Sequence, residues 1–442
     1  MDIRIVTFSL AAWAWTLCSQ AQQVWTVNDC MAYAVKHNHN VRKQQLELDS
    51  YRSSQTQAIG AFLPSIDGGV GAQYNFGRAI DPETNTYTNV STFYNSYSMS
   101  ASVQLFDGLQ RLNKLNAARA DVLMGKSSLQ SQQDQAALNA FQAFVNVLYY
   151  QGTVQMAQAK LKESQLMLQQ TRIMEEVGTK SAADVAQMEA QLATDDYDLT
   201  CQQSLFSTAL LTLKQEMSYP MDQELTVDSL LISGLQLSPT LDNVQEVSEF
   251  ALKNNPGIQQ VSYARQSARH HWLSAKGSLF PTLSMGGGIN TTYNKTLHNP
   301  HAASFSNQFR NNEGEYLAFH LSIPLFNRLS TVSNIRKARN SYRIAQEQYD
   351  AQCDELRKLV EQALLDRESY LKQSIQMDKK VKSDELAYQL VKRQYEEGLS
   401  NPVEVQTNAA TLLQSRATLL QSRLMFLLKD KLVEYYKGKD LY

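Results

Sequence analysis

The sequence lacks the residue clusters from which catalytic and metal sites are commonly built. Its closest histidine pairs are spaced by two and by one, so neither pair shares a helical face; they are His37/His39 and His270/His271. No HExxH, P-loop, GxGxxG or GxSxG motif is present. Cysteines outside the N-terminal segment are too widely spaced for a disulfide framework or a metal site; they are Cys30, Cys201 and Cys353. We therefore predict no catalytic residues, no bound cofactor and no metal.

An excess of one charge sign is also absent. The 41 Lys and Arg residues nearly balance the 43 Asp and Glu residues, for a formal net charge of −2. Because no basic stripe stands out, the composition argues against a nucleic-acid partner. After the N-terminal segment, no apolar run is long enough for a helix to cross a bilayer.

The N-terminal segment has the pattern of a secretory signal peptide over residues 1–21. Arg4 precedes the apolar run Ile5–Leu17, and Ser19 and Ala21 form a small-x-small cleavage site. The 13-residue run is shorter than a membrane-spanning helix requires. Lipidation at Cys18 is the alternative, although Leu17 is too bulky for a good acylation site.

Proline is scarce, with nine residues in 442, and it is missing from two long segments. Residues 109–175 and 330–396 hold 67 residues each, which as helices would be about 100 Å long. Shorter helices are expected at residues 40–61, 181–217 and 256–277. In the second long segment, eight residues recur every 3.5 to 3.6 positions on average, which predicts a gently twisted coiled-coil seam: Ala338, Tyr342, Ala345, Tyr349, Cys353, Leu356, Val360 and Ala363.

The two halves of the chain repeat each other. "GAFLPSIDGGVG" (60–71) matches "GSLFPTLSMGGG" (277–288) at an offset of 217 residues. "EEVGTKSAADV" (175–185) matches "YEEGLSNPVEV" (395–405) at an offset of 220. The offset changes within the polar segments between these blocks, where a surface loop tolerates insertion. Four matched blocks in the same order indicate an internal duplication.

A two-residue period predicts β-strands just before each long helix. Met99, Ala101, Val103 and Leu105 alternate with serine and glutamine, and Leu321, Ile323 and Leu325 alternate in the second half. An earlier strand is expected in each half, after the Leu/Phe-Pro turn. We expect polar loops between the strands, the second covering residues 294–315.

Each half therefore reads as helix, β-hairpin, long helix, turn and helix. Four amphipathic strands cannot close a barrel alone, and open edges are not tolerated in lipid. Three copies would supply twelve strands, within the range of outer-membrane barrels. The predicted fold is mainly α with a membrane β-barrel, and its homotrimer combines a 12-strand β-barrel with a long α-helical barrel.

The expected domain boundaries follow the duplication. The first repeat covers residues 22–217, with hairpin strands at about 65–106 and a long helical coil at about 109–217. A linker follows at 218–240. The second repeat covers 241–431, with hairpin strands at about 281–326 and a coil at about 330–431. Residues 432–442 form a C-terminal tail.

This duplicated plan resembles the TolC family of outer-membrane channel proteins over essentially the whole mature chain. The most specific marks are the paired turns "EVGTKSAADV" and "EEGLSNPVEV" and the strand boundaries "LPS"/"FPT" and "LFDG"/"LFNR". The resemblance implies a homotrimeric channel-tunnel in the outer membrane of a Gram-negative bacterium, in contact with outer-membrane lipid and extending into the periplasm. Its implied partners are a periplasmic adaptor protein and an inner-membrane pump, in a tripartite efflux or type I secretion system.

The resemblance also implies that the two turns dock the adaptor. The corresponding residues are Gly178, Thr179, Lys180, Gly398, Leu399 and Ser400. The second turn keeps the family's Gly-Leu-Ser/Thr pattern, whereas the first turn has no leucine. We therefore expect Leu399 to contribute more to docking than Thr179. From the residues alone, Gly178 and Gly398 are expected at positive φ, with Ser181 and Asn401 as the next N-caps.

A periplasmic gate just above the turns is the last implication of the family. Family channels close there with polar links between neighbouring coils and with rings of acidic residues. By alignment on the turn glycines, Tyr395 and Asp184 match the linking tyrosine and aspartate, and Glu404 matches a ring carboxylate. Ser400 replaces the family's arginine, so we expect a weaker clamp unless Lys180 or Arg393 substitutes for it.

One other class of protein shares the long rods and the signal peptide. An exported periplasmic or cell-surface coiled-coil scaffold would have both features without a pore, but it would not need four amphipathic strands beside the rods. Within the channel class, the sequence does not distinguish export of drugs or other small molecules from export of proteins.

Overall fold

The computed structural model describes residues 24–80, 85–89, 91–228, 242–297 and 303–441. The predicted signal peptide and Cys18 lie outside the described residues, as does the end of the predicted linker. The chain divides into two compact units. A sheet unit comprises Leu46–Ser127 and Gln259–Ala351, and a coil unit comprises the remainder. Within the described ranges, no helix is both long enough and apolar enough to cross a membrane.

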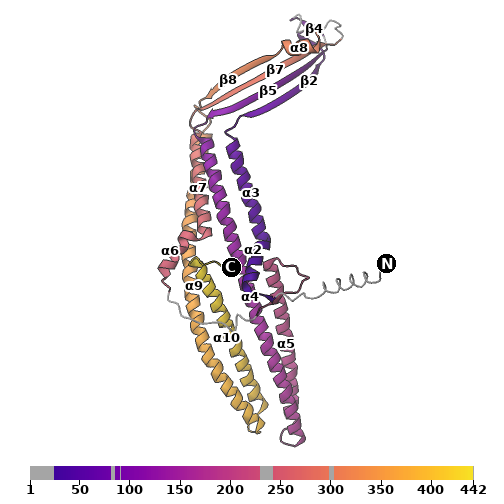
Figure 1. The fold of residues 1–442 in the computed structure, drawn as a ribbon, viewed down its shortest axis with the longest axis vertical. Helices are drawn as coiled ribbons and strands as arrows, with labels where there is room; N and C mark the ends of the chain where they lie inside the picture. Colours follow the sequence, from indigo (N-terminus) through magenta and orange to yellow (C-terminus); the bar gives the residue numbers. More distant parts are fainter. Residues whose placement is uncertain (1–23, 81–84, 90, 229–241, 298–302, 442) are drawn as a thin grey trace, which may run out of the picture. The chain divides into compact units, whose positions relative to one another are not determined.

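The sheet unit contains four antiparallel strands (Figure 1). They are β2 (Ser65–Asn75), β5 (Thr92–Phe106), β7 (Thr282–Thr296) and β8 (Gly314–Ser322), in the order β2-β5-β7-β8. The two predicted hairpins are therefore joined along β5 and β7. A separate small hairpin pairs β3 (Arg78–Ile80) with β4 (Tyr87–Asn89). We call the end of the sheet that leads into α4 and α9 the helix end, and the opposite end the loop end.

Strand register gives the sheet one apolar and one polar face. Residues directly opposite each other in an antiparallel pair share a face. Val103 pairs with Met285, which pairs with Phe319, whereas Gln104 pairs with Ser284, which pairs with His320. The apolar face also carries Ile66, Val70, Tyr97, Met99, Ala101, Leu283, Ile289, Leu317 and Leu321. The polar face also carries Ser65, Asp67, Ser96, Ser98, Ser100, Ser102, Asn290, Thr292, Tyr316 and Ser322.

The strands differ from the sequence prediction at three places. Strand β8 ends at Ser322, so Ile323 and Leu325 lie outside it; Pro324 lacks an N–H for the ladder and restricts the residue before it. In β5 the register shifts between Gln104 and Phe106, which pairs Phe106 with Leu283 and leaves Leu105 out of the ladder. The loop expected at 294–315 instead contains the end of β7, the start of β8, and helix α8 (Phe305–Asn311).

The predicted long helices are confirmed almost to the residue. Helix α4 covers Gln110–Glu176 and α9 covers Ser330–Glu396, with 67 residues each. The shorter helices are α3 (His39–Gly60), α5 (Ala182–Met217), α7 (Pro256–Gly277) and α10 (Pro402–Tyr436). Helix α10 extends into the expected C-terminal tail and ends at Tyr436. The first glycine that can end it is Gly438, at φ +85°.

The predicted coiled-coil seam of α9 is also confirmed. Between Ala338 and Ala363, the residues that are not exposed to solvent are the eight seam residues, Cys353 among them. Their neighbours on the helix are exposed. The seam spacing therefore identified the packed face of this helix correctly.

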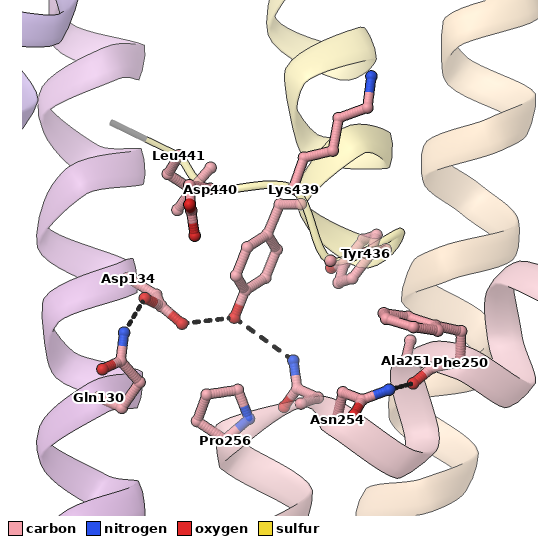
Figure 2. A pocket seen from close by; sticks show the side chains of 13 residues that line it. Gln130, Asp134, Phe250, Ala251, Asn254, Pro256, Tyr436, Lys439, Asp440 and Leu441 are labelled. Carbon is pink, nitrogen blue, oxygen red and sulfur yellow. Dashed lines mark hydrogen bonds between the residues drawn. The ribbon is translucent and has the colours of Figure 1, made fainter.

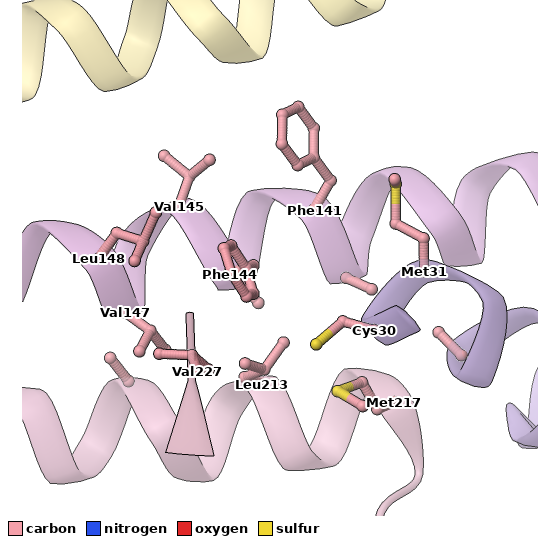
Figure 3. Packing of buried hydrophobic residues seen from close by; sticks show 14 of the residues in the cluster. Cys30, Met31, Phe141, Phe144, Val145, Val147, Leu148, Leu213, Met217 and Val227 are labelled. Carbon is pink, nitrogen blue, oxygen red and sulfur yellow. The ribbon is translucent and has the colours of Figure 1, made fainter. Parts of the chain in front are cut away.

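The core of the coil unit is centred on α2, α4 and α5 (Figure 3). Helix α2 covers Val27–His37, and its Cys30 and Met31 are fully buried against α4 residues such as Phe144. Burial raises the pKa of the Cys30 thiol to about 12, so this cysteine is a protonated packing residue. Beside the core, β1 (Val24–Trp25) pairs with β6 (Thr226–Val227), and α6 covers Val244–Asn254.

Candidate functional site: the two helix–turn–helix tips

Two sharp turns connect the helices of the coil unit in pairs. Gly178 joins α4 to α5 at φ +81°, and Gly398 joins α9 to α10 at φ +78°. Each turn closes on the helix before it, because Thr179 N donates to Met174 O at 2.8 Å and Leu399 N donates to Gln394 O at 2.7 Å. The positive φ predicted for both glycines is confirmed, and it explains why glycine ends each helix.

The next helix begins in the same way after both turns. Ser181 is the N-cap of α5 and forms a capping box with Asp184. Asn401 is the N-cap of α10, where its side chain accepts from Glu404 N at 2.9 Å, and Pro402 occupies the first turn. Both predicted caps are therefore confirmed. These bonds satisfy N–H groups at the start of each helix and hold the turns in fixed conformations.

Lys180 bridges the two turns. Its Nζ donates to the Ser400 carbonyl oxygen at 3.1 Å and lies 4.3 Å from the centroid of the Tyr395 ring. Lys180 is partly buried, whereas its neighbour Thr179 is exposed. A cation therefore occupies the position between the turns, although Ser400 itself has replaced the arginine expected from the family.

Tyr395 is fully buried beneath this bridge. Its hydroxyl lies 2.7 Å from Thr171 Oγ1, which itself donates to Met167 O at 2.7 Å. Burial is the main cause that raises the pKa of Tyr395, so its phenol stays protonated. The surrounding cluster draws on all four helices of the two tips: Met167, Leu168, Met188, Tyr388, Val405 and Leu412.

The two carboxylates predicted for the gate are engaged within their own turns. Asp184 accepts from the Ser181 N–H at 2.9 Å and from its hydroxyl at 2.8 Å, and these bonds lower the pKa of Asp184. Glu404 accepts from the Ser400 hydroxyl at 2.5 Å. Tyr395, Asp184 and Glu404 thus belong to the same two tips, and their hydrogen-bond partners Thr171, Ser181 and Ser400 lie in the same chain.

Leu399 is the most exposed apolar side chain of the second turn, with 77% of its surface accessible. The corresponding position of the first turn is Thr179, which is polar and also exposed. The two turns therefore share a backbone conformation but present different surfaces. The unequal docking roles expected from the sequence stay a prediction.

A pair of matched polar triads was missed by sequence reasoning. Between α4 and α5, Lys160 Nζ lies 2.7 Å from the Asp195 carboxylate, which also accepts from the Ser164 hydroxyl. Between α9 and α10, Lys380 contacts Asp384 at 2.5 Å and the Ser415 hydroxyl at 3.0 Å.

The two triads occupy equivalent positions 220 residues apart, with serine and aspartate exchanged. Asp195 has no exposed side-chain surface, whereas 18% of the Asp384 side chain is accessible. The internal repeat could have revealed this exchange, had both helices of each half been aligned through to their polar seam residues.

A separate pocket lies near the C-terminal segment of the coil unit (Figure 2). Its volume is about 480 Å³. Tyr435 lines it and donates to Asp134 at 2.9 Å, and Gln130 donates to the same carboxylate at 2.9 Å. Burial raises the pKa of Asp134. The hydrogen bond from Tyr435 to Asp134 connects the end of α10 to α4.

Long paired helices, two capped tip turns and an amphipathic antiparallel sheet together define the architecture of an outer-membrane channel. The family described as "Outer membrane efflux protein" matches residues 32–217 and 247–427. The outer membrane efflux protein BepC of Brucella suis biovar 1 (strain 1330) is 22% identical over 350 residues, which are 78% of this chain and 71% of BepC.

Solved structures agree on the fold. CusC matches with a TM-score of 0.78 at 19% identity, covering 94% of this chain and 92% of CusC. VceC from Vibrio cholerae matches with a TM-score of 0.74 at 14% identity, covering 94% of this chain and 97% of VceC.

The chain belongs to the outer membrane efflux protein family. It is an efflux channel of the Gram-negative outer membrane that extends into the periplasm, and its family works in tripartite pumps with an adaptor and an inner-membrane pump. Members of this family are transport channels and not enzymes, in agreement with the prediction from motifs. The family assignment favours the channel over the pore-free scaffold.

Proposed function

We propose that three copies of this chain form one tunnel, with a 12-strand β-barrel and a barrel of long helices, through which substrates leave the periplasm. In this proposal, residues 22–217 and 241–431 each supply one hairpin and one coil. The family resemblance also implies a belt around the equator of the helical barrel, to which the linker 218–240 and the tail 432–442 would belong; residues 229–240 and 442 lie outside the described residues. Outer-membrane lipid surrounds the apolar face of the sheet, and the polar face lines the lumen.

The observation that carries this proposal is the pair of strands at the ends of the sheet. Strands β2 and β8 each have one neighbour in the sheet of a single chain. Unpaired strand edges are not tolerated in hydrocarbon, because their N–H and C=O groups have no water to bind. Pairing β8 of one copy with β2 of the next satisfies both edges, and three copies give an even number of strands within the known range.

Cell fractionation followed by gel electrophoresis without and with boiling tests the proposal. The protein should partition with the outer membrane and migrate as a trimer until the sample is boiled. Release with the soluble periplasmic fraction, or migration as a monomer before boiling, would instead support the pore-free scaffold.

We further propose that the tip turns dock a periplasmic adaptor, chiefly through Leu399. Burial of an exposed leucine contributes about 1.5–3 kcal/mol. Leu399→Ala should therefore weaken binding to the purified cognate adaptor by roughly ten-fold or more. Thr179→Ala is the matched control in the first turn, and its effect should be small. Binding is best measured by titration, and equal losses in the two variants would contradict a dominant role for Leu399.

Gate closure is the second role that we propose for the tips. Tyr395, Asp184 and Glu404 lie in the helix ends next to the two turns that Lys180 connects, and three symmetry-related copies of Glu404 would form a negative ring. Lys180 takes the place of the family's arginine in this proposal, because its ammonium group holds the Ser400 carbonyl and covers the Tyr395 ring.

Lys180→Met should raise the single-channel conductance in a planar bilayer. The variant keeps the aliphatic stem but loses both the hydrogen bond and the cation–π contact, worth together about 1–3 kcal/mol. Arg172→Met is a suitable control, since Arg172 forms an exposed ion pair with Glu189 that does not join the two turns. Unchanged conductance in Lys180→Met, with trimers intact, would remove Lys180 from the gate.

A further inference from the structure

Helix α8 closes part of the sheet edge that β8 leaves open. Strand β8 pairs with β7 only as far as Asn290 and Gly314, but β7 continues to Thr296. The Gln308 side chain accepts from Asn294 N at 2.9 Å and donates to Asn294 O at 2.7 Å. Asn312 Nδ2 donates to Thr292 O at 2.8 Å. Side chains of this segment thus replace the missing strand bonds at the loop end.

The helix packs on the apolar face of the sheet. Thr291, which pairs with Tyr97 on that face, donates from Oγ1 to the Phe309 carbonyl at 2.6 Å and is only 6% exposed. The Tyr97 ring lies 6.1 Å from Phe305 and 5.4 Å from Phe309, between ring centroids. Tyr293 lies 5.2 Å from Phe305. These rings fix α8 on one side of the sheet.

Two phenyl rings of α8 remain partly open. Phe305 and Phe309 are one helical turn apart and retain 45% and 41% of their surface. They extend an exposed apolar surface that runs along the sheet: Met99, Ile289, Leu317, Phe319 and Leu321.

The position of α8 along the strands matches the expected boundary of the hydrocarbon. Strand β8 has nine residues, or about 30 Å along its own axis. Tilted as barrel strands are, it would span close to the 25 Å or so of an outer-membrane apolar band. The first residue of β8 is Gly314, and α8 ends three residues before it. Outer-membrane barrels carry girdles of aromatic residues at that depth.

We propose that α8 is an interfacial foot that rests in the outer leaflet, with Phe305 and Phe309 in contact with lipid at the boundary between headgroups and acyl chains. This proposal rests on the assignment of the apolar face to lipid. Lipid is the occupant that fits, because the open rings continue the apolar surface of the sheet and stand where the membrane boundary falls. The foot fixes how deeply the sheet sits in the membrane.

Tryptophan emission in vesicles tests the depth of α8. Three variants of the full chain are compared in phosphatidylcholine vesicles that carry a nitroxide quencher either near the headgroup or near the bilayer centre: Phe309→Trp on α8, Leu317→Trp on the apolar face, and His320→Trp on the polar face. Wild-type emission, from the native tryptophans, is subtracted. Phe309→Trp should lose most emission with the shallow quencher, Leu317→Trp with the deep quencher, and His320→Trp with neither.

The three positions separate failure of the foot from failure of the barrel. If Leu317→Trp is quenched while Phe309→Trp is not, α8 is in water or covered by a neighbouring copy, and the foot is overturned while the barrel stands. Stronger quenching of Phe309→Trp by the deep quencher would also overturn an interfacial position. If His320→Trp is quenched in place of Leu317→Trp, the two faces are assigned wrongly and the proposed barrel fails as well.

Discussion

Arginine in place of Val103 should prevent most of the protein from assembling in the outer membrane. Val103 pairs with Met285 on the apolar face of the sheet, where the proposed barrel contacts lipid. An arginine facing lipid near the middle of the bilayer costs about 2–4 kcal/mol. A trimer would bear that cost three times. The measurement is the amount of heat-modifiable trimer recovered from the outer membrane.

Gln104→Arg provides the matched control one residue along the same strand. Gln104 pairs with Ser284 on the polar face, so its arginine would extend into an aqueous lumen at little cost. Because side chains alternate between faces, the arginine would contact lipid in Val103→Arg and water in Gln104→Arg, at almost the same position along the strand. Equal recovery of trimers from both variants would contradict the assignment of the two faces.

Alanine in place of Asp195 should destabilise the coil unit more than any other single change discussed for it. The variant leaves the Lys160 ammonium group, 17% exposed, without its carboxylate, and it removes the acceptor of the Ser164 hydroxyl. Breaking one partner of a buried ion pair costs about 3–5 kcal/mol, because the remaining charge stays desolvated. Loss of the helical circular dichroism signal on heating measures the effect.

Asp384→Ala is the control that the duplicated chain itself supplies. Asp384 makes the same two kinds of contact in the second triad, but its lysine partner, Lys380, is 48% exposed. An exposed pair contributes about 0–1 kcal/mol. The heat-induced transition should therefore fall much further in Asp195→Ala than in Asp384→Ala. Similar shifts in both variants would show that burial does not set the strength of these triads.

Most of the fold could be predicted from regular residue spacing in the sequence. The 67-residue helices could be predicted because they lack proline and keep a constant spacing of packed residues such as Ala345 and Val360. The tip turns could be predicted because Gly178 and Gly398 supply a backbone conformation that other residues avoid. Such features depend on neighbours within a few positions, which a single sequence displays directly.

Features that depend on distant partners were not predictable in the same way. Helix α8 is held by bonds from Gln308 to Asn294 and from Thr291 to Phe309, and its seven residues show too little periodicity to stand out as a helix. The register shift beside Leu105 exists only relative to β7. The early end of β8 could have been predicted from the sequence, because Pro324 cannot donate a hydrogen bond to the strand ladder.

At the tips, the sequence predicts the two turns and their N-caps, but it does not predict the side-chain contacts of the proposed gate residues. The resemblance predicts that Tyr395 and Asp184 link neighbouring coils. Within one chain, Tyr395 of α9 contacts Thr171 of α4, whereas Asp184 contacts Ser181 of its own turn. Lys180 was named as a possible replacement for the absent arginine, but its contact with the Ser400 carbonyl required coordinates. Side-chain partners across two turns are set by helix packing, which residue spacing alone does not define.

The exchange of serine and aspartate between the two triads constrains how the halves diverged after the gene was duplicated. Ser164/Asp195 corresponds to Asp384/Ser415, so the shortest route between the two arrangements passes through a form with two serines or with two aspartates. Two serines leave a lysine unpaired, and two aspartates place like charges side by side. Either intermediate is tolerated more easily around the half-exposed Lys380 than around Lys160. Exchange of serine and aspartate should therefore cost less stability in the second half than in the first.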